Sequence, residues 1–397
     1  MKTARTLALF RRHVISNYRR LGVVVVRGRG SEVWDADGRR YIDLFPGWAV
    51  SGLGHCHPAV VRALRDQAGK LIHVANNFYN EPQALLAEQI ARRGFGGQSF
   101  FCNSGAEAME AAVKLARLAS GGRRWKFVSM LNSFHGRTFA AITATGQPKY
   151  HQGFKPLVPG FSYAPFNDLG AVRKLVGRET AGIILEPIQG EGGVNVAAPE
   201  YMKALRALCD RTGALLILDE VQTGVGRTGK WFAHQHYGIT PDIMTMAKAL
   251  GGGTAIGAIC ARPEVAKFLV PGTHASTFGG NPLAAAAGVA VFEAIARDGL
   301  LENARKTGAY LVKRLQAMSA RHPGLVREIR GKGLMVGMEL SRPGAALAER
   351  CLAAGLLVNC THDTVMRFAP AMNIGRRILD EGLDIYGDCL EKFAAGG

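Results

Sequence analysis

The sequence predicts an α/β protein, with a large domain built on a mostly parallel sheet between helices and a smaller α+β domain. Short apolar runs alternate with helical stretches through the middle of the chain, a pattern typical of a sheet that helices cover on both faces. Around residue 300 this alternation gives way to a long amphipathic helix, followed by strands, a helix, a strand and a helix. A chain of 397 residues with 48% hydrophobic content is long enough for two such domains.

The N-terminal segment has the pattern of folded protein. Residues 23–45 (VVVVRGRGSEVWDADGRRYIDLF) predict two alternating strands around the turn from Asp35 to Gly38. The first 31 residues contain eight Lys or Arg and no acid, which superficially resembles an organelle transit peptide. Because the strand pattern begins inside this stretch, we interpret it as mature sequence and expect residues 1–50 to join the smaller domain.

The large domain is expected at residues 51–295. Apolar spacing predicts helices over 58–70 and 81–93, the second with Pro82 in its first turn and Gly94 at its end. The predicted strands are QSFFC (98–102), WKFVSM (125–130), GIILEP (182–187), ALLILDE (214–220) and IGAIC (256–260). Between them lie helical stretches such as 106–119 and 199–210. The smaller domain, residues 296–397, would contain the strands VREIR (326–330) and GLMVGMEL (333–340).

Cysteine usage and hydropathy exclude several classes of protein. The seven scattered cysteines form no CxxC pair, which argues against a disulfide framework or a metal site and favours a reducing, cytoplasmic compartment. No apolar stretch approaches the roughly 18 residues that cross a membrane, so no membrane association is expected.

The formal net charge of +18 permits a nucleic-acid partner. However, the sequence has no basic cluster interleaved with aromatic residues and no known nucleic-acid-binding motif. A solvated basic surface that attracts anionic metabolites is therefore the favoured interpretation. A basic nucleic-acid-binding protein stays as the alternative from another class of function.

The pairing of Lys248 with Asp219 is the most informative feature of the chain. Lys248 follows an apolar segment and precedes three glycines, 29 residues after the Asp219 that ends the run ALLILD. A desolvated amine and a buried carboxylate are the two groups that pyridoxal phosphate needs from a protein, one for the carbonyl and one for the pyridinium. Taken singly, each has a simpler interpretation: a charge at a helix end, or an N-cap for the next helix.

Two motifs could bind a phosphate group. The run NSGAEA (103–108) follows a predicted strand and opens a helix, whose free amides and dipole favour an anion. The capping-box spacing of Ser104 and Glu107 would explain the same motif without a ligand. In THASTFGGNP (273–282), Ser276 and Thr277 offer hydroxyl groups before a helix, either as a phosphate cradle or as a plain cap.

Two further motifs contain candidate binding residues. The first has an aromatic residue and an arginine, and the second has two acids. In SFHGRT (133–138), Phe134 could stack on a planar ring and Arg137 could clamp a carboxylate. The alternative is a buried Phe beside a surface Arg. In LEPIQGEGGV, Glu186 ends a predicted strand and Glu191 lies in a glycine loop, where both could equally be solvated acids.

Together these stretches resemble one family. NSGAEA, FHGRT, EPIQGEGG, LDEVQTGVGRTG, AKALGGG and STFGGNPLA occur here in the order found in the class III (ornithine-type) aminotransferases that depend on pyridoxal phosphate. The resemblance extends from about Tyr18 to Pro370. It implies fold type I of the pyridoxal-phosphate-dependent transferases, with a seven-stranded, mostly parallel sheet, and a homodimer whose active sites lie at the subunit interface.

The resemblance also implies roles for individual residues. Lys248 would bind the cofactor covalently and move the Cα proton, because desolvation lowers the pKa of its amine. Asp219 would keep the pyridine nitrogen protonated. Other residues implied to bind the cofactor are Gly105, Ala106, Phe134, Glu220, Val221, Gln222 and, from the other subunit, Thr277. Residues implied to bind substrate are Trp48, Arg137, Glu191, Ser276 and Arg367.

Some of these roles are more specific. Val221 would lie beneath the cofactor ring, Phe134 would stack on its opposite face, and Gln222 would reach its phenolic oxygen. Arg367 would grip the α-carboxylate of glutamate or 2-oxoglutarate, and Glu191 would neutralise it in the other half of a ping-pong reaction. The segments NNFYNEPQ, ATGQPKYHQGF and PGTHASTFGGNPLA are most similar to the acetylornithine branch of the family. This implies transfer of the δ-amino group of N-acetylornithine to 2-oxoglutarate, giving N-acetylglutamate 5-semialdehyde and glutamate in arginine biosynthesis.

Two places depart from the pattern of that branch. Trp48 stands where the branch has a small aliphatic residue, and Thr254-Ala255 replaces its Phe-Pro. The alternative is therefore an aminotransferase that acts on ornithine, 4-aminobutyrate or a carrier-bound aminoadipate semialdehyde. The indole N–H can donate to an amide or carboxylate oxygen but cannot accept from an ammonium, which favours an acylated α-nitrogen over free ornithine.

Overall fold

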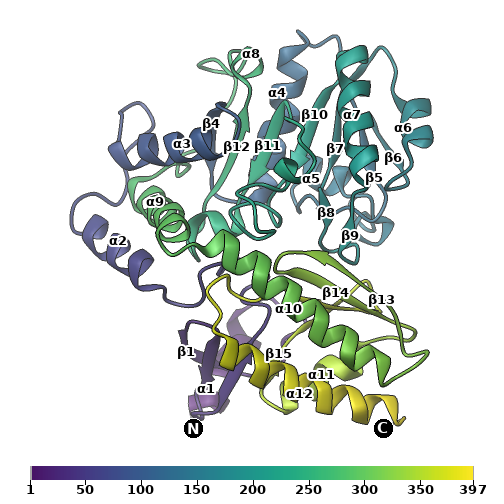
Figure 1. Ribbon diagram of the computed structural model, residues 1–397. Helices are drawn as coiled ribbons and strands as arrows, with labels where there is room; N and C mark the ends of the chain where they lie inside the picture. Colours follow the sequence, from purple (N-terminus) through teal and green to yellow (C-terminus); the bar gives the residue numbers. More distant parts are fainter. Residues whose placement is uncertain (1, 397) are drawn as a thin grey trace.

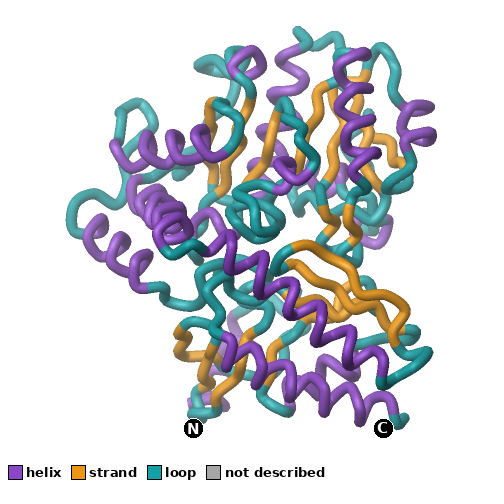
Figure 2. Tube along the Cα trace, in the orientation of Figure 1, coloured by secondary structure: helices purple, strands orange, loops and turns teal. Residues whose placement is uncertain are grey.

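The computed structural model describes residues 2–396, and its centre is a seven-stranded sheet flanked by helices (Figure 1, Figure 2). The strand order is β4 (Gln98–Cys102), β12 (Gly257–Ala261), β11 (Ile243–Met246), β10 (Leu215–Asp219), β7 (Thr180–Leu185), β5 (Lys126–Met130) and β6 (Phe161–Ala164). Only β12 runs antiparallel to its two neighbours in this sheet. The predicted mostly parallel, seven-stranded sheet is confirmed, and β6 and β11 are strands that the apolar runs did not reveal.

Alternation along the central strands explains why helices cover both faces of the sheet. On β10, Ile217 packs in one core with residues of α4, whereas Leu216 and Leu218 pack in another with residues of α7. The helices of the large domain are α2 (Pro58–Ala68), α3 (Glu81–Arg93), α4 (Gly105–Ala119), α5 (Phe139–Ala144), α6 (Leu169–Leu175), α7 (Pro199–Thr212), α8 (Pro263–Ala266) and α9 (Pro282–Arg297). The short elements are β8 (Ile188–Gln189), β9 (Asn195–Val196) and the 3₁₀ turns η1 (Pro148–Tyr150), η2 (Ala233–His236) and η3 (Lys248–Gly251).

The C-terminal region forms a separate layer below the large sheet, with α10 lying between them in Figure 1. Its four-stranded sheet has the order β13 (Val326–Lys332), β14 (Met335–Leu340), β17 (Val365–Phe368) and β16 (Asn359–Thr361). Its helices are α10 (Leu300–Ala320), α11 (Ala345–Ala353) and α12 (Arg376–Ala394). The predicted helix, two strands and helix are present, but three strands (β15, β16 and β17) lie between α11 and α12, where one was expected.

The N-terminal strands pair with the C-terminal region. β1 (Val25–Arg29), β2 (Glu32–Asp35) and β3 (Arg40–Asp43) form an antiparallel sheet, and β15 (Leu356–Leu357) adds to β3 in parallel. The predicted turn from Asp35 to Gly38 is present between β2 and β3, but the first predicted strand is divided into β1 and β2, because the chain also reverses at Gly30, whose φ of +58° suits glycine. The helix α1 (Lys2–His13) was not expected. These contacts support grouping residues 1–50 with 296–397, and the domain boundaries stay a prediction.

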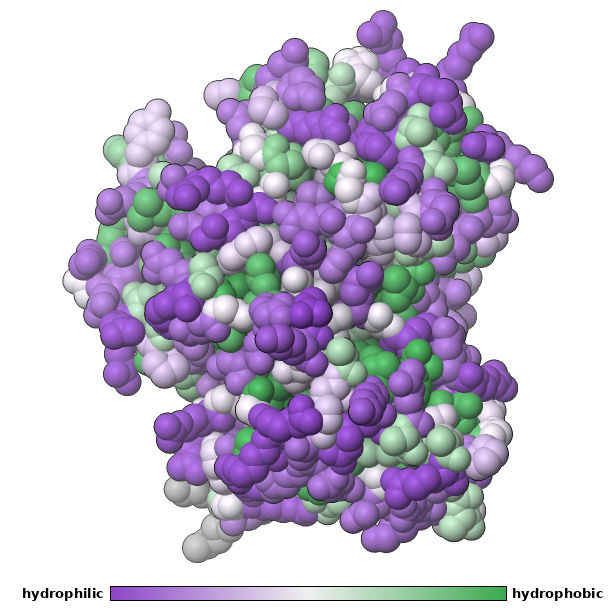
Figure 3. Space-filling model, viewed as in Figure 1, coloured by the Kyte–Doolittle hydropathy of each residue, from purple (hydrophilic) through white to green (hydrophobic). Residues whose placement is uncertain are grey.

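The surface is mainly hydrophilic on the face drawn in Figure 3. Within residues 2–396, no helix is both long and apolar enough to cross a bilayer. The same residues contain no group of three or more His, Cys, Asp or Glu side chains arranged to hold a metal ion. All seven cysteines are free thiols.

Candidate active site

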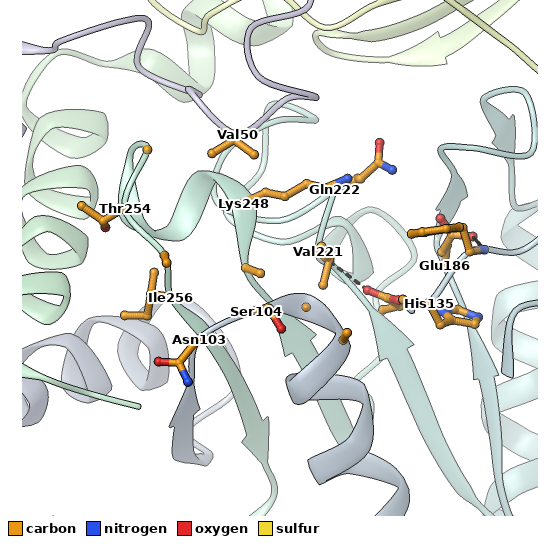
Figure 4. A pocket seen from close by; sticks show the side chains of 18 residues that line it. Val50, Asn103, Ser104, His135, Glu186, Val221, Gln222, Lys248, Thr254 and Ile256 are labelled. Carbon is orange, nitrogen blue, oxygen red and sulfur yellow. Dashed lines mark hydrogen bonds and ion pairs between the residues drawn. The ribbon is translucent and has the colours of Figure 1, made fainter. Parts of the chain in front are cut away.

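A cavity of about 370 Å³ lies at the carboxyl ends of the parallel strands (Figure 4). Parallel sheets place their ligand sites at this edge, because the loops that follow successive strands converge there. The antiparallel strand β12 adds its preceding loop to the same edge. The residues that line the cavity are Val50, 103–106, 134–136, Glu186, Asp219, Val221, Gln222, Ala247, Lys248 and 253–256.

Lys248 enters this cavity directly after β11. Its backbone has a φ of +44°, a conformation that is uncommon for a residue with a side chain and that concentrates at functional sites. Burial lowers the pKa of the amine to about 8, against the opposing influence of the Glu191 carboxylate. The neutral amine, which can act as a nucleophile or base, is therefore easier to reach near physiological pH than it is for an exposed lysine.

Asp219 is buried at the end of β10, and its carboxylate is held by three contacts. Its Oδ1 atom accepts hydrogen bonds from the Thr245 hydroxyl at 2.9 Å and from the Val221 amide at 3.1 Å. Its Oδ2 atom lies 2.6 Å from Nδ1 of the buried His135. No α-helix begins at the residues that follow, so Asp219 does not act as a helix N-cap. The side chain is a fixed anion beside the cavity.

The first turn of α4 forms another part of the cavity wall. The Ser104 hydroxyl accepts from the Glu107 amide at 3.2 Å, and the Glu107 carboxylate accepts from the Asn103 amide at 3.0 Å. The capping interpretation is correct, and it leaves the amides of Gly105 and Ala106 facing the cavity without helix partners. A Cβ atom on Gly105 would lie 3.0 Å from Cγ2 of Val221, so a larger residue here would have to displace the Val221 side chain. Such a helix start suits a phosphate.

Arg367 and Glu191 form a buried ion pair with an N–O distance of 2.8 Å. The amide of Gln222 donates to Glu191 at 3.3 Å, and Asn359 Oδ1 accepts two hydrogen bonds from the Arg367 guanidinium at 2.8 and 3.0 Å. Burial opposes ionisation of Glu191, but the positive charges of Arg367 and Lys248 outweigh it and lower the pKa of this carboxyl. The Arg367 guanidinium is a fixed positive charge beside the cavity, and the Glu191 carboxylate is the negative charge that compensates it.

Phe134 and Arg137 separate in the structure. Phe134 lines the cavity, as expected for a residue that stacks on a ring. Arg137 is exposed, and its guanidinium lies 4.1 Å from the centre of the Tyr150 ring and 5.5 Å from that of Phe134. Arg137 therefore stands outside the cavity wall of a single chain.

The other expected contacts do not reach the cavity within one chain. Ser276 accepts from the Gly279 amide at 3.0 Å, and Thr277 is exposed. Trp48 is 57% exposed and has a φ of +63°. The carboxylate of Glu220 is used elsewhere, since it accepts from the Thr223 hydroxyl and from the backbone amides of residues 233 and 234. The expectation that Glu220 contacts a cofactor has no support in this geometry.

His135 and Glu186 are the two site residues that sequence reasoning left without a role. His135 lines the cavity and touches Asp219, and Glu186 is buried beside it. Burial raises the pKa of Glu186 to about 7. The only sequence signal was position, because His135 follows the stacking candidate Phe134 directly and Glu186 ends a strand at the sheet edge.

Comparison with known proteins identifies the family. Residues 14–390 match the family model described as aminotransferase class-III. The chain belongs to this family. The acetylornithine aminotransferase of Caldanaerobacter subterraneus subsp. tengcongensis is 51% identical over 387 residues, covering 96% of this chain and 98% of that relative.

Two solved structures extend the comparison. The ornithine aminotransferase of Toxoplasma gondii ME49 superimposes with a TM-score of 0.94 at 33% identity, covering 100% of this chain and 96% of the other. The N-acetylornithine aminotransferase of Stenotrophomonas maltophilia K279a gives a TM-score of 0.84 at 38% identity, with 96% and 99% covered. Class III aminotransferases depend on pyridoxal phosphate, and the amine, fixed carboxylate and open helix N-terminus of this cavity fit that cofactor.

Proposed function

We propose that this class III aminotransferase transfers the δ-amino group of N-acetylornithine to 2-oxoglutarate in arginine biosynthesis. The observation that carries the proposal is the buried pair of Arg367 and Glu191 beside the cavity. The proposed reaction has a dicarboxylate as substrate in one half-reaction and a donor with a single carboxylate in the other. An arginine with a movable acid partner serves both needs, and the names of the most similar relatives favour N-acetylornithine as the donor.

Pyridoxal phosphate, when bound, supplies a ring that accepts the electrons released at the carbon that bears the transferred amino group. We assign to the Lys248 amine the covalent attachment and the proton transfers at the carbon that bears the amino group, which is Cδ of N-acetylornithine and Cα of glutamate. Asp219 holds the ring nitrogen protonated, and the amides of Gly105 and Ala106 bind the phosphate. The low pKa of Lys248 supports its role, because a base must be neutral before it can accept a proton.

The remaining assignments concern the ring and the substrates. Phe134 and Val221 enclose the two faces of the ring, and Gln222 contacts its phenolic oxygen. Arg367 binds the α-carboxylate of glutamate or 2-oxoglutarate when Glu191 releases it. Four residues that lie outside the cavity of one chain are assigned to the site as a dimer forms it: Trp48, Arg137, Ser276 and Thr277.

The dimer itself is proposed on the pattern of exposed apolar side chains. Phe78, Tyr79 and Phe278 are 66%, 106% and 59% exposed. Their segments lie together, since the Asn76 amide donates to the backbone carbonyls of Ser276 and Gly279. An apolar surface of this kind, next to Thr277, suits a subunit interface. The double variant F78D/Y79D should sediment as a monomer, whereas L175D on α6 should leave the oligomer unchanged; a monomeric wild type would overturn the proposal.

The donor is tested by comparing kcat/KM for N-acetylornithine, ornithine and 4-aminobutyrate, with 2-oxoglutarate as acceptor. We expect N-acetylornithine to be preferred, and the variant Trp48→Ile to change the ratio between N-acetylornithine and ornithine. A wild type that prefers free ornithine by tenfold or more would replace the proposal with the ornithine alternative. The observation that supports that alternative is the close superposition on an ornithine aminotransferase.

A cytoplasmic location and the absence of a specific nucleic-acid partner are part of the proposal. Free thiols throughout the chain support a reducing compartment. Any association of the basic surface with DNA should weaken steeply as salt is raised, because it would rest on phosphate contacts alone. Sequence-selective binding at physiological salt would contradict this.

A further inference from the structure

A second cavity, of about 470 Å³, lies at the amino ends of the central parallel strands. Its wall is formed where α4 and α7 end and where β7 and β10 begin. It therefore lies at the opposite edge of the sheet from the active-site cavity. In Figure 1 this edge is the side of the large domain away from the C-terminal region. The apolar part of its lining consists of Ala116, Ala119, Ala181 and Leu215.

Three arginines line this cavity, and none of its lining residues is an acid. Arg123 and Arg124 follow α4, and Arg178 precedes β7. The Glu179 carboxylate, next to Arg178 in sequence, pairs with Lys126 at 2.6 Å instead. Within residues 2–396, none of the three arginines forms an ion pair with a carboxylate. The described part of the chain therefore supplies no counter-ion for these positive charges.

The turn after α4 fixes the position of Arg124. The Ser120 hydroxyl accepts from the Arg124 amide at 3.1 Å, and the guanidinium donates through Nη1 to the Thr212 carbonyl at 2.8 Å. A Cβ atom on Gly213 would lie 3.2 Å from Nη2, so glycine leaves room for the guanidinium at this point. The bond to Thr212 uses one of the five N–H donors that a guanidinium carries. Arg124 is thus held in place while keeping donors for a ligand.

The nearby helix ends account for only part of this charge. The last carbonyl groups of α4 and α7 carry partial negative charge, of roughly half an elementary charge per helix. Arg124 contacts the Thr212 carbonyl at the end of α7, and Arg123 Nε lies 3.4 Å from the Ser120 carbonyl after α4. Arg178 takes no part in these bonds. Three full positive charges exceed the partial charges of two helix ends, so the cavity retains a net attraction for anions.

We propose that this cavity binds a phosphate group, carried by a small organic phosphate or present as the free ion. A guanidinium recognises phosphate through paired N–H···O bonds. A phosphate group has three acceptor oxygens and a charge of about −2 near neutral pH, so one group can use several arginines, whereas a carboxylate has two oxygens and one charge. The volume lies in the range of roughly 300–1,000 Å³ that is usual for small-molecule sites. The inference does not depend on the proposed substrates.

Calorimetric titration of the holoenzyme tests the site, with phenyl phosphate and inorganic phosphate as separate probes. We expect both to bind the wild type, and R123Q/R178Q to raise Kd roughly tenfold or more, because hydrogen bonds to a charged group are lost. Both substituted side chains are exposed, and the bond between Arg124 and Thr212 stays intact. In phosphate-free buffer, the variant should have the kcat/KM of the wild type, which verifies its fold. Tighter binding of phenyl phosphate would identify an organic phosphate as the ligand, and equal binding the free ion.

The matched control is R11Q/R12Q, which removes the same charge from exposed positions on α1, at the far end of the molecule in Figure 1. At physiological ionic strength its Kd should stay within about threefold of the wild type, because exposed charges beyond a Debye length are screened. The same loss of affinity in R11Q/R12Q as in R123Q/R178Q would show general attraction to a basic surface and overturn the inference. So would equal affinity in the wild type and R123Q/R178Q, or binding of neither probe.

Discussion

The guanidinium of Arg367 contacts the Glu191 carboxylate at 2.8 Å, and their side chains are only 1% and 11% exposed. Buried pairs of this kind are strongly asymmetric, because removal of one partner leaves the other charge uncompensated. Removal of the Glu191 carboxylate should therefore change the two half-reactions in different ways.

Glu191→Gln should affect the two substrates in opposite ways. With Arg367 no longer paired to a carboxylate, KM for glutamate should stay the same or fall. For N-acetylornithine, kcat/KM should fall by roughly tenfold or more, because the donor then meets a buried, unpaired cation. Steady-state kinetics on both substrates checks this. Glu302→Gln, in an exposed pair with Arg305, is the control and should change neither. Equal losses for both substrates would contradict the model.

Lys248→Ala should fold and bind pyridoxal phosphate but lose almost all turnover, because covalent attachment and proton transfer depend on the same amine. Borohydride treatment of the wild-type holoenzyme, followed by peptide mapping, should place the cofactor on the peptide that contains Lys248. A label on Lys230 or Lys332 would refute the assignment.

Asp219→Asn should fold normally, since an amide oxygen can still accept from Thr245 and Val221. Its turnover should fall by about 10² or more, the order of loss found when a preorganised charge contact is removed. Asp168→Asn is the matched control, because Asp168 caps α6 through a 2.9 Å bond from Ala171 and Asn caps equally well. Near-normal turnover in Asp219→Asn would show that the carboxylate is structural.

Glu186 should make the stability of the apoprotein depend on pH. Burial raises its pKa from 4.5 to about 7, so the neutral form is favoured in the folded state. Its stabilising contribution is present below about pH 4.5 and is lost as the pH rises to about 7. From pH 5 to 8, Glu186→Gln should therefore gain on the order of 2–3 kcal/mol in free energy of unfolding relative to wild type. Urea denaturation measures this, and the exposed Glu264→Gln should show no such trend.

Much of the fold follows from local patterns. The alternation of buried runs and helical stretches predicted the central layers, and Pro82 and Gly94 marked the ends of α3 correctly. Strand direction is not encoded in a period of two residues, so the antiparallel course of β12 could not be foreseen. β6 was missed because its FSYA sequence is short and half-exposed.

Site residues could be predicted where a sequence motif is typical of a particular chemistry. They were harder to predict where a contact depends on tertiary packing. Lys248, Asp219 and Gly105 line one cavity although they are far apart in the chain. The 2.6 Å contact between His135 and Asp219 joins residues 84 positions apart, so no local sequence pattern could predict it. Glu220 shows the reverse, since its neighbours in the motif face the cavity while its own carboxylate turns to the loop at residues 223–234.

The parallel pairing of β3 with β15 constrains the order in which parts of this chain can fold during synthesis. Ile42 meets Leu356, so the early strands leave the ribosome more than 300 residues before their partner exists. Every strand of the central sheet, by contrast, is complete once residue 261 has emerged. The catalytic half can therefore assemble first, while β3 waits with one edge open. Nascent or truncated chains are most prone to aggregate through that edge, and the density of arginines around it is a natural protection.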